Sequence, residues 1–268
     1  MVHFSRFDIE KYQPLYVPLA IFAGCLVIAI AIYASGGVTI GGQQAGDSSS
    51  VAGAQCGDLP DPKEITVATD DDPVLGDPNA PLTMISFSDA SCGYCARFFL
   101  ETFPKIKADY IDTGKLRFVF RDFTIHGETA ILAAEAAHCA NEQGKFWEYW
   151  KAIFSSAESL SADVLKSMAG GLGLDTGAFN SCLSSDKYRD EVVKDGQDGQ
   201  NYGIRGTPSF FLGKTGSLNG TLQWECSGEE QVSSFVSDTA AFIVGAYPYE
   251  DSGQYQGFKS QIEAALAK

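Results

Sequence analysis

The sequence is poor in cations: it has 19 Lys and Arg residues against 34 Asp and Glu residues, and a formal net charge of −15. Binding to a nucleic-acid backbone needs clustered cations, so this balance argues against a nucleic-acid partner. Apolar residues, by contrast, make up 45% of the 268 residues. This share excludes disorder throughout the chain and fits one folded domain with an additional segment at one end.

Charged residues are absent from residues 15–34, which read LYVPLAIFAGCLVIAIAIYA. A helix of this length spans about 30 Å, the hydrocarbon thickness of a bilayer. The nearby cations, Arg6 and Lys11, precede the run. The positive-inside rule therefore predicts a single-pass helix in the cell membrane, with residues 1–14 in the cytoplasm and the rest of the chain outside. A cleaved signal peptide is the alternative, although its apolar core is usually only about 7–15 residues long.

Large apolar side chains are also scarce in residues 35–62, which are rich in Gly, Ser, Ala, Gln and Asp. This composition is typical of a flexible tether. Residues 63–268 are numerous enough to form a sizeable core, either as one domain or as one domain with an inserted subdomain. We therefore expect a membrane helix, a tether and an external domain, in that order.

The hydrophobic pattern of the external domain begins with a strand–helix–strand unit. Short apolar runs at 82–87 and 116–120 predict buried strands, and residues 93–112 carry apolar side chains at near-helical spacing. Two strands connected in this way should be parallel. We expect the intervening helix to bend at Pro104.

Helical periodicity then replaces the strand pattern from about residue 124 to residue 200, which predicts a helical insertion. Strand patterns return at 209–212 and 241–246, and a helix over 249–267 closes the chain. Between these strands, residues 214–240 are expected to form an extended connection. The whole pattern predicts an α/β fold with a mixed sheet and helices on both faces.

Cysteine chemistry centres on one pair, Cys92 and Cys95, which is the only C-x-x-C pair among seven cysteines. Zinc would need two more ligands at suitable spacing, and the chain has only three histidines, so redox chemistry is favoured over a metal site or a structural disulfide. The pair lies where a strand ends and a helix begins, and the free N–H groups and dipole of a helix start lower a thiol pKa. We predict that Cys92 is the exposed nucleophile, that Cys95 resolves the mixed disulfide, and that no metal or cofactor is needed.

Residues 87–98, FSDASCGYCARF, resemble the active-site segment of DsbA-like members of the thioredoxin superfamily. Three further matches follow in the expected order: His126 ahead of an Ala-rich helix, residues 143–147 (QGKFW) and residues 203–211 (GIRGTPSFF). The resemblance covers roughly residues 64–213 and 241–267. It implies a thioredoxin fold with an inserted helical subdomain, and thiol–disulfide exchange at the cysteine pair.

The resemblance also implies a cis peptide before Pro208. In this position Pro208 would lie against the two sulfurs, and Thr207 would offer backbone groups to an extended substrate segment. An ordinary turn proline before a strand is the simpler alternative.

Further roles follow from the resemblance for other residues. Cys139 and Cys182 occupy positions at which some relatives carry a second disulfide, so we predict that they pair. Cys56 and Cys226 are then the remaining external cysteines, and whether they also pair, stapling the tether to the domain, stays open.

Two polar residues near the cysteine pair also leave alternatives open. Asp89 either tunes the Cys92 thiol or caps the helix, with equal support for each. His126 matches a position of the family, where it either takes part in catalysis or simply starts a helix.

The dipeptide between the cysteines bears on the direction of catalysis. The family commonly has Pro in place of Gly93, and Gly93-Tyr94 together with Thr207 is similar to disulfide isomerases and reductases. Isomerases of that kind carry a separate dimerisation domain, and residues 35–62 are too short and polar to be one. We therefore predict an oxidase that introduces disulfides into exported, cysteine-containing proteins, and the family implies a quinone-linked membrane partner that reoxidises it. The alternatives are an isomerase or reductase kept reduced by a membrane electron donor, and a non-catalytic module that binds peptides.

Overall fold

The computed structural model describes residues 59–156, 160–227 and 230–268. The expected membrane helix at 15–34 and the tether up to residue 58 lie outside these residues. Within the described residues, no helix is both long and apolar enough to cross a bilayer.

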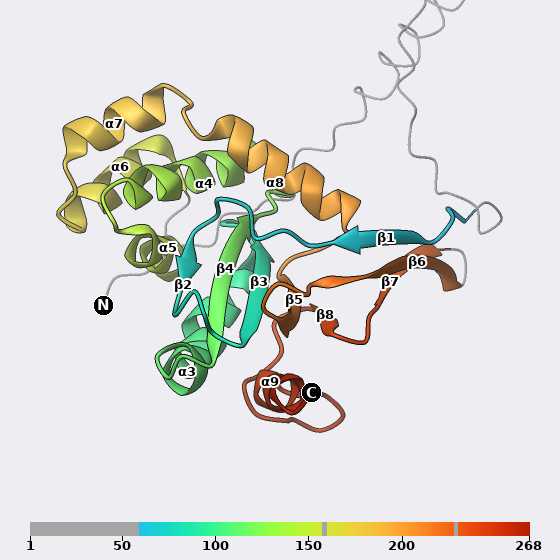
Figure 1. Ribbon diagram of the computed structural model, residues 1–268. Coiled ribbons are helices and arrows are strands. Elements are labelled where there is room, and N and C mark those ends of the chain that lie inside the picture. The colour runs from blue at the N-terminus through green and yellow to red at the C-terminus, as the bar shows by residue number, and fades with distance from the viewer. Residues whose placement is uncertain (1–58, 157–159, 228–229) are drawn as a thin grey trace, which may run out of the picture. The chain divides into compact units, whose positions relative to one another are not determined.

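The centre of the domain is a five-stranded sheet with the strand order β2-β4-β3-β5-β8 (Figure 1). Its strands are β2 (Val74–Leu75), β3 (Leu82–Ser88), β4 (Leu116–Asp122), β5 (Ser209–Lys214) and β8 (Ala240–Val244). β3 and β4 pair in parallel, which confirms the predicted unit, and the remaining pairs are antiparallel. Every residue of β3 is buried, so this strand lies at the centre of the core.

A helical segment connects β3 to β4 and changes its winding along its length. It comprises α2 (Gly93–Arg97), the π-helical turn η1 (Phe98–Thr102), α3 (Phe103–Ile106) and a second π-helical turn η2 (Lys107–Ile111). Pro104 lies in the first turn of α3, with a π-helical turn on each side of that helix, and the bend expected at Pro104 stays a prediction. The segment contributes Phe98 to the core, where its ring packs against Phe210 with 4.6 Å between centroids.

The closing helix, α9 (Phe258–Leu266), is shorter than the predicted span of 249–267. It begins directly after Gly257, its N-cap. A Cβ at Gly257 would lie 2.4 Å from the backbone of Glu250, so the loop before the helix folds back closely at this point. The residues before Gly257 are thereby held in a loop instead of in the helix.

The predicted helical insertion is confirmed. It consists of α4 (Glu128–Asn141), α5 (Phe146–Ser155), α6 (Ala162–Gly171), α7 (Thr176–Ser184) and α8 (Arg189–Asn201). α8 returns to the sheet, and Gly199 permits the approach, because a Cβ there would lie 2.6 Å from the ring of Phe123. The insertion is thus packed directly onto the end of β4.

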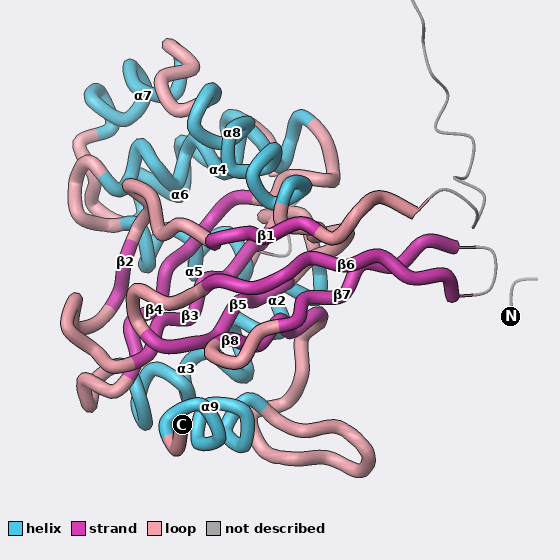
Figure 2. The backbone as a smooth tube through the Cα atoms, turned by 45° about the vertical axis from the view of Figure 1, so that its right-hand side comes forward, coloured by secondary structure: helices cyan, strands magenta, loops and turns pink. Residues whose placement is uncertain are grey.

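Residues 214–240 form a structure that the hydrophobic pattern did not predict. β6 (Asn219–Ser227) and β7 (Glu230–Val236) make an antiparallel hairpin, and β1 (Lys63–Thr66) pairs with β6 to complete a three-stranded sheet. Figure 2 shows the three strands side by side. Ile65 and Leu222 from this sheet share a second apolar core with Ile85 and Phe211, whereas Met84 belongs to the main core under the helices.

A disulfide joins Cys139 in α4 to Cys182 in α7, as the resemblance implies. The bond closes a loop with a sequence separation of 43. Chain-entropy models give such a loop about 4 kcal/mol of stabilisation through the unfolded state. We expect Cys139→Ser/Cys182→Ser to lose about that free energy of unfolding, measured by urea denaturation. An unchanged midpoint would show that packing alone fixes α4 against α7.

Candidate active site at the cysteine pair

Cys92 and Cys95 lie at the junction between β3 and α2. Cys92 is the N-cap residue of α2, and Cys95 lies one turn into the helix. Cys92 is only 7% exposed, and Cys95 is fully buried. The expectation that Cys92 is exposed is therefore wrong: the exposed residue of this turn is Tyr94, at 63%.

The loop before β5 covers Cys92. The peptide bond between Thr207 and Pro208 is cis, as the resemblance implies. The Cys92 thiol donates a hydrogen bond to the carbonyl oxygen of Thr207, with 3.4 Å between sulfur and oxygen. The hydroxyl oxygen of Thr207 is buried and, apart from Cys92, has no hydrogen-bond partner among the described residues, so its proton is available to the Cys92 thiolate.

The two thiols have opposite electrostatic environments. A hydrogen bond from the Cys95 thiol has the largest effect on the pKa of Cys92, which it lowers. Hydrogen bonds from Thr207 and from the backbone N–H groups of Cys95 and Tyr94 lower this pKa further, whereas burial raises it. The resulting pKa of Cys92 is about 5. Burial, followed by the interaction with Cys92, raises the pKa of Cys95 far above its ordinary value. At neutral pH the arrangement therefore holds Cys92 as the anion and Cys95 as the thiol.

Asp89 connects the cysteine turn to the loop after β4. Its carboxylate is fully buried and accepts hydrogen bonds from the backbone N–H groups of Ser91, at 2.7 Å, and His126, at 3.0 Å. The His126 Nδ1 atom lies 3.0 Å from the same carboxylate. The alternative that Asp89 caps the helix is wrong, since the N-cap is Cys92 and no side chain accepts a hydrogen bond there.

A groove of about 530 Å³ opens beside Cys92. Apolar side chains of the inserted helix α5, including Ile153 and Phe154, form part of its wall, and His126 lines it together with Cys92. The His126 side chain is 45% exposed. His126 also precedes α4, whose N-cap is Gly127, so it lies both near a helix start and at the wall of the groove. The site therefore combines a stabilised thiolate with an open, partly apolar surface next to it.

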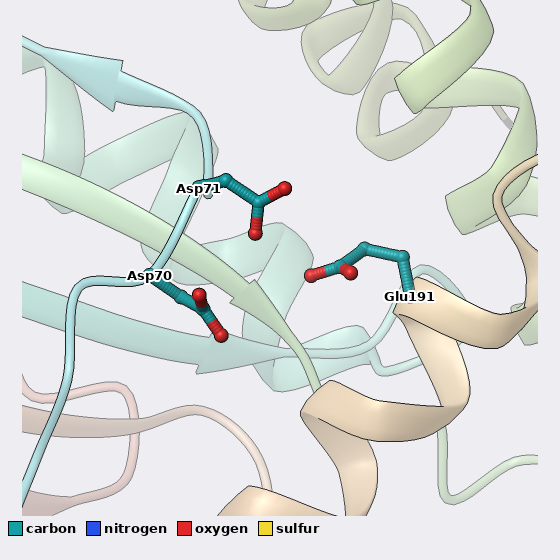
Figure 3. A group of neighbouring side chains, drawn as sticks. All are labelled: Asp70, Asp71 and Glu191. Carbon is teal, nitrogen blue, oxygen red and sulfur yellow. The ribbon is translucent and has the colours of Figure 1, made fainter.

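Possible metal ligands and the cysteines outside the C-x-x-C pair were also considered in the sequence, and the structure describes only part of them. Among the described residues, the side chains grouped closely enough to hold a metal ion are acidic ones on the loop before β2 and on α8, away from the cysteine pair in sequence, and they include Asp70, Asp71 and Glu191 (Figure 3). Cys56 and the side chain of Cys226 lie outside the described residues, so their pairing stays open.

Arg121 and Asp122 belong to a buried charge cluster that the sequence pattern does not predict. Arg121 lies at the end of β4 and is fully buried. Its guanidinium pairs with Asp195 and lies 2.9 Å from the carboxylate of Asp72 and 2.8 Å from that of Asp198. The next residue, Asp122, lies 2.8 Å from His138. The signal in the sequence was the Arg-Asp pair that directly follows the apolar residues of a buried strand.

Comparison with known proteins identifies related chains. A family model described as thioredoxin matches residues 68–226. The "Disulfide bond formation protein D" of Bacillus subtilis is 29% identical over 148 residues, which make up 52% of this chain and 67% of that protein. A "Putative protein-disulfide oxidoreductase" of Rickettsia felis is 27% identical over 158 residues, 56% of each chain. The chain thus spans about two thirds of one relative and just over half of the other.

Two solved structures are also similar to this chain. The structure of alpha-DsbA1 from Wolbachia pipientis is 28% identical, with a TM-score of 0.56, and the match covers 74% of this chain and 92% of that one. The structure of BdbD from Bacillus subtilis matches with 23% identity and a TM-score of 0.54 over 74% of this chain and 94% of that one. At this level of identity, the similarity to BdbD shows a shared fold.

Proposed function

The chain belongs to the thioredoxin family, and from this premise we propose that it introduces disulfides into cysteine-containing proteins outside the cytoplasm. It is a thiol–disulfide oxidoreductase of the DsbA type, with relatives named for disulfide bond formation and protein-disulfide oxidation. The observation that carries the oxidising direction is the contrast between the two thiols. A low pKa of Cys92 stabilises the reduced, anionic form, which favours transfer of oxidising equivalents to a substrate.

The reaction begins with Cys92 and Cys95 joined in a disulfide. A substrate thiolate attacks the sulfur of Cys92, the Cys92–Cys95 bond breaks, and Cys95 leaves and takes up a proton, as its raised pKa favours. A second substrate thiolate then attacks the substrate sulfur of the mixed disulfide and releases Cys92 as a thiolate. The substrate dithiol loses two electrons and becomes a disulfide, and the enzyme pair gains them.

Substrate binding in this proposal uses the surface around Cys92. Thr207 lies beside the sulfur and offers backbone groups to an extended segment, and Pro208, which has no N–H, lies next to it. The groove along α5 would accept apolar side chains of the substrate. Asp89 and His126 would tune the site indirectly, because their hydrogen bonds fix the turn that carries Cys92.

The reduction potential tests the direction of catalysis. We expect a potential well above that of thioredoxin, which is about −270 mV, and nearer to the value of about −120 mV of strongly oxidising family members. The measurement is equilibration of the full chain with glutathione redox buffers. A value near −270 mV would instead identify a reductase or isomerase. Cys92→Ser should abolish oxidation of a reduced model protein; oxidation that survives this change would contradict the role of Cys92.

Location and partner complete the proposal. We propose that residues 15–34 anchor the enzyme in the cell membrane with the domain outside, and that a quinone-linked membrane protein reoxidises the cysteine pair without a bound cofactor on this chain. The twenty uncharged residues after Arg6 and Lys11 support the anchor. Protease added to intact cells should remove the domain, and quinone depletion should leave the pair reduced. A protected domain, or a pair that stays oxidised, would contradict these two points.

A further inference from the structure

A histidine and a buried aspartate lie side by side next to the cysteine pair. His126 lies on the loop between β4 and α4, and its Nδ1 atom is 3.0 Å from the carboxylate of Asp89, which is fully buried. Asp89 is also the one ion-pair partner of His126 among the described residues. Because an ionised carboxylate only accepts hydrogen bonds, Nδ1 of the neutral imidazole carries the proton and Nε2 carries the free lone pair.

Asp89 also contacts both cysteines through its backbone. Its carbonyl oxygen accepts a hydrogen bond from the N–H of Cys92, with 3.1 Å between the atoms, and its own N–H donates to the sulfur of Cys95. The carboxylate of the same residue holds the ring of His126. The imidazole is therefore fixed, through a single residue, relative to the two sulfurs that take part in the exchange.

The groove beside Cys92 gives this imidazole access to a substrate. His126 and Cys92 both line the groove, and the His126 side chain is 45% exposed. Of the described residues that line it, His126 is the only ionisable side chain other than Cys92. Its Nε2 atom has no hydrogen-bond partner in the described part of the chain. A substrate cysteine that reaches Cys92 along the groove therefore meets one ionisable proton acceptor, Nε2 of His126.

We propose that His126 is a catalytic residue of the oxidation reaction, in which its Nε2 atom takes the proton from the first substrate thiol. This role rests on the proposed function. A thiol with an ordinary pKa of ~8.5 is only a few per cent ionised at pH 7, and only the thiolate attacks a disulfide. Proton transfer to His126 generates the thiolate beside the Cys92–Cys95 bond. Asp89 is a positioning residue that holds the imidazole in the tautomer with a free Nε2.

Protons and electrons balance over the two exchange steps. The first substrate thiol gives its proton to Nε2, and its sulfur bonds to Cys92 as the Cys92–Cys95 bond breaks. The Cys95 thiolate takes up one proton, while His126 gives up the proton that it accepted. The second substrate thiol loses its proton to water, and its sulfur displaces Cys92 as a thiolate. The substrate loses two electrons and two protons, the cysteine pair gains two electrons and one proton, and one proton enters the solvent.

Single-turnover kinetics of the oxidised, detergent-solubilised full chain with a reduced two-cysteine peptide test this role. The asparagine of His126→Asn keeps an N–H donor for Asp89, but its amide is not basic enough to take a thiol proton. At pH 7 we expect oxidation of the peptide to be about tenfold slower in this variant. At pH 9.5 about 90% of a thiol with a pKa of ~8.5 is ionised without a base, so the two rates should agree within about twofold. Both cysteines of the oxidised chain are in the disulfide, so neither contributes to this pH dependence.

His126→Ala is the matched control, because it removes the hydrogen-bond donor together with the base. If His126 acts as a base, both variants are slow at pH 7. If it only holds Asp89, the Asn variant keeps the rate of the unchanged chain and the Ala variant alone is slow, which would overturn the proposal. A deficit in His126→Asn of equal size at pH 7 and pH 9.5 would overturn it as well.

Two further measurements separate the base from other roles. The equilibrium constant of His126→Asn with glutathione should stay within about twofold of that of the unchanged chain, since a base changes rates and not equilibria; a larger change would indicate redox tuning instead. Asp89→Asn places a donor against Nδ1 and favours the tautomer with the proton on Nε2, so it should show the same deficit at pH 7 and recovery at pH 9.5. A deficit that does not recover would overturn the positioning role of Asp89. Failure of the unchanged chain to oxidise the peptide at either pH would instead contradict the proposed function itself.

Discussion

Replacing Cys95 with Ala is expected to raise the pKa of Cys92 from about 5 toward the ordinary thiol value of ~8.5. The reason is that the hydrogen bond from the Cys95 thiol is the largest influence that lowers the pKa of Cys92. With an ordinary pKa, only a few per cent of the thiol would be ionised at neutral pH, so alkylation of Cys92 would slow accordingly. The thiolate absorbance at 240 nm, followed against pH, measures the change directly.

Cys95→Ser is the matched control for this experiment. A serine hydroxyl keeps a hydrogen-bond donor near the sulfur of Cys92, so the pKa of Cys92 should stay closer to that of the unchanged protein. Both variants lack the resolving thiol and should accumulate mixed disulfides, so only the electrostatic effect distinguishes them. If the Ala variant keeps a pKa near 5, the N–H groups at the start of α2 are sufficient by themselves.

The pKa of Cys92 in these two variants also shows how much of the thiolate stabilisation could be predicted from the sequence. The position of Cys92 at a strand–helix junction followed from the pattern of apolar residues, and it predicted backbone N–H groups near the sulfur. The larger influence comes from the side chain of Cys95, and another comes from Thr207, which lies 115 residues later in the chain. Contacts of this kind depend on side-chain placement in the folded domain, which residue spacing does not reveal.

The elements of the fold likewise differ in how well the sequence predicts them. β3 and β4 follow from short, continuous apolar runs, because almost all of their residues are buried, and the helical insertion follows from helical periodicity. β1 and β2 are short, and β1 finds its partner in β6, where Lys63 pairs with Leu222. Such distant pairing of short strands leaves little local signal. Arg121 was overlooked for a related reason: its partners come from the loop before β2 and from α8, which only the tertiary fold brings together.

Arg121→Met is expected to destabilise the domain by about 3–5 kcal/mol at neutral pH, the usual cost of removing one partner from a buried ion pair. Methionine fills similar space, but it leaves Asp195 buried without its countercharge. The free energy of unfolding in urea gives the loss. Arg117→Met is the control, because Arg117 is half-buried and donates a hydrogen bond to the Thr83 hydroxyl, with 2.7 Å between the atoms, outside the buried charge cluster. Its loss should stay within about 1 kcal/mol.

The pH dependence separates lost charge from lost packing in Arg121→Met. A carboxyl whose pKa is higher in the folded than in the unfolded state binds protons preferentially when folded, so its stability contribution falls as pH rises above the unfolded pKa of ~3.9. Asp72, with a folded pKa of about 10, already behaves in this way. Without Arg121, Asp198 loses a hydrogen bond that lowers its pKa, so the variant loses stability with rising pH more steeply than the unchanged protein. The difference between the two proteins should therefore be smaller at pH 5 than at pH 8. An equal difference at both values would mean that Arg121 acts through the packing of its side chain, and the buried carboxylates would then be neutral with or without it.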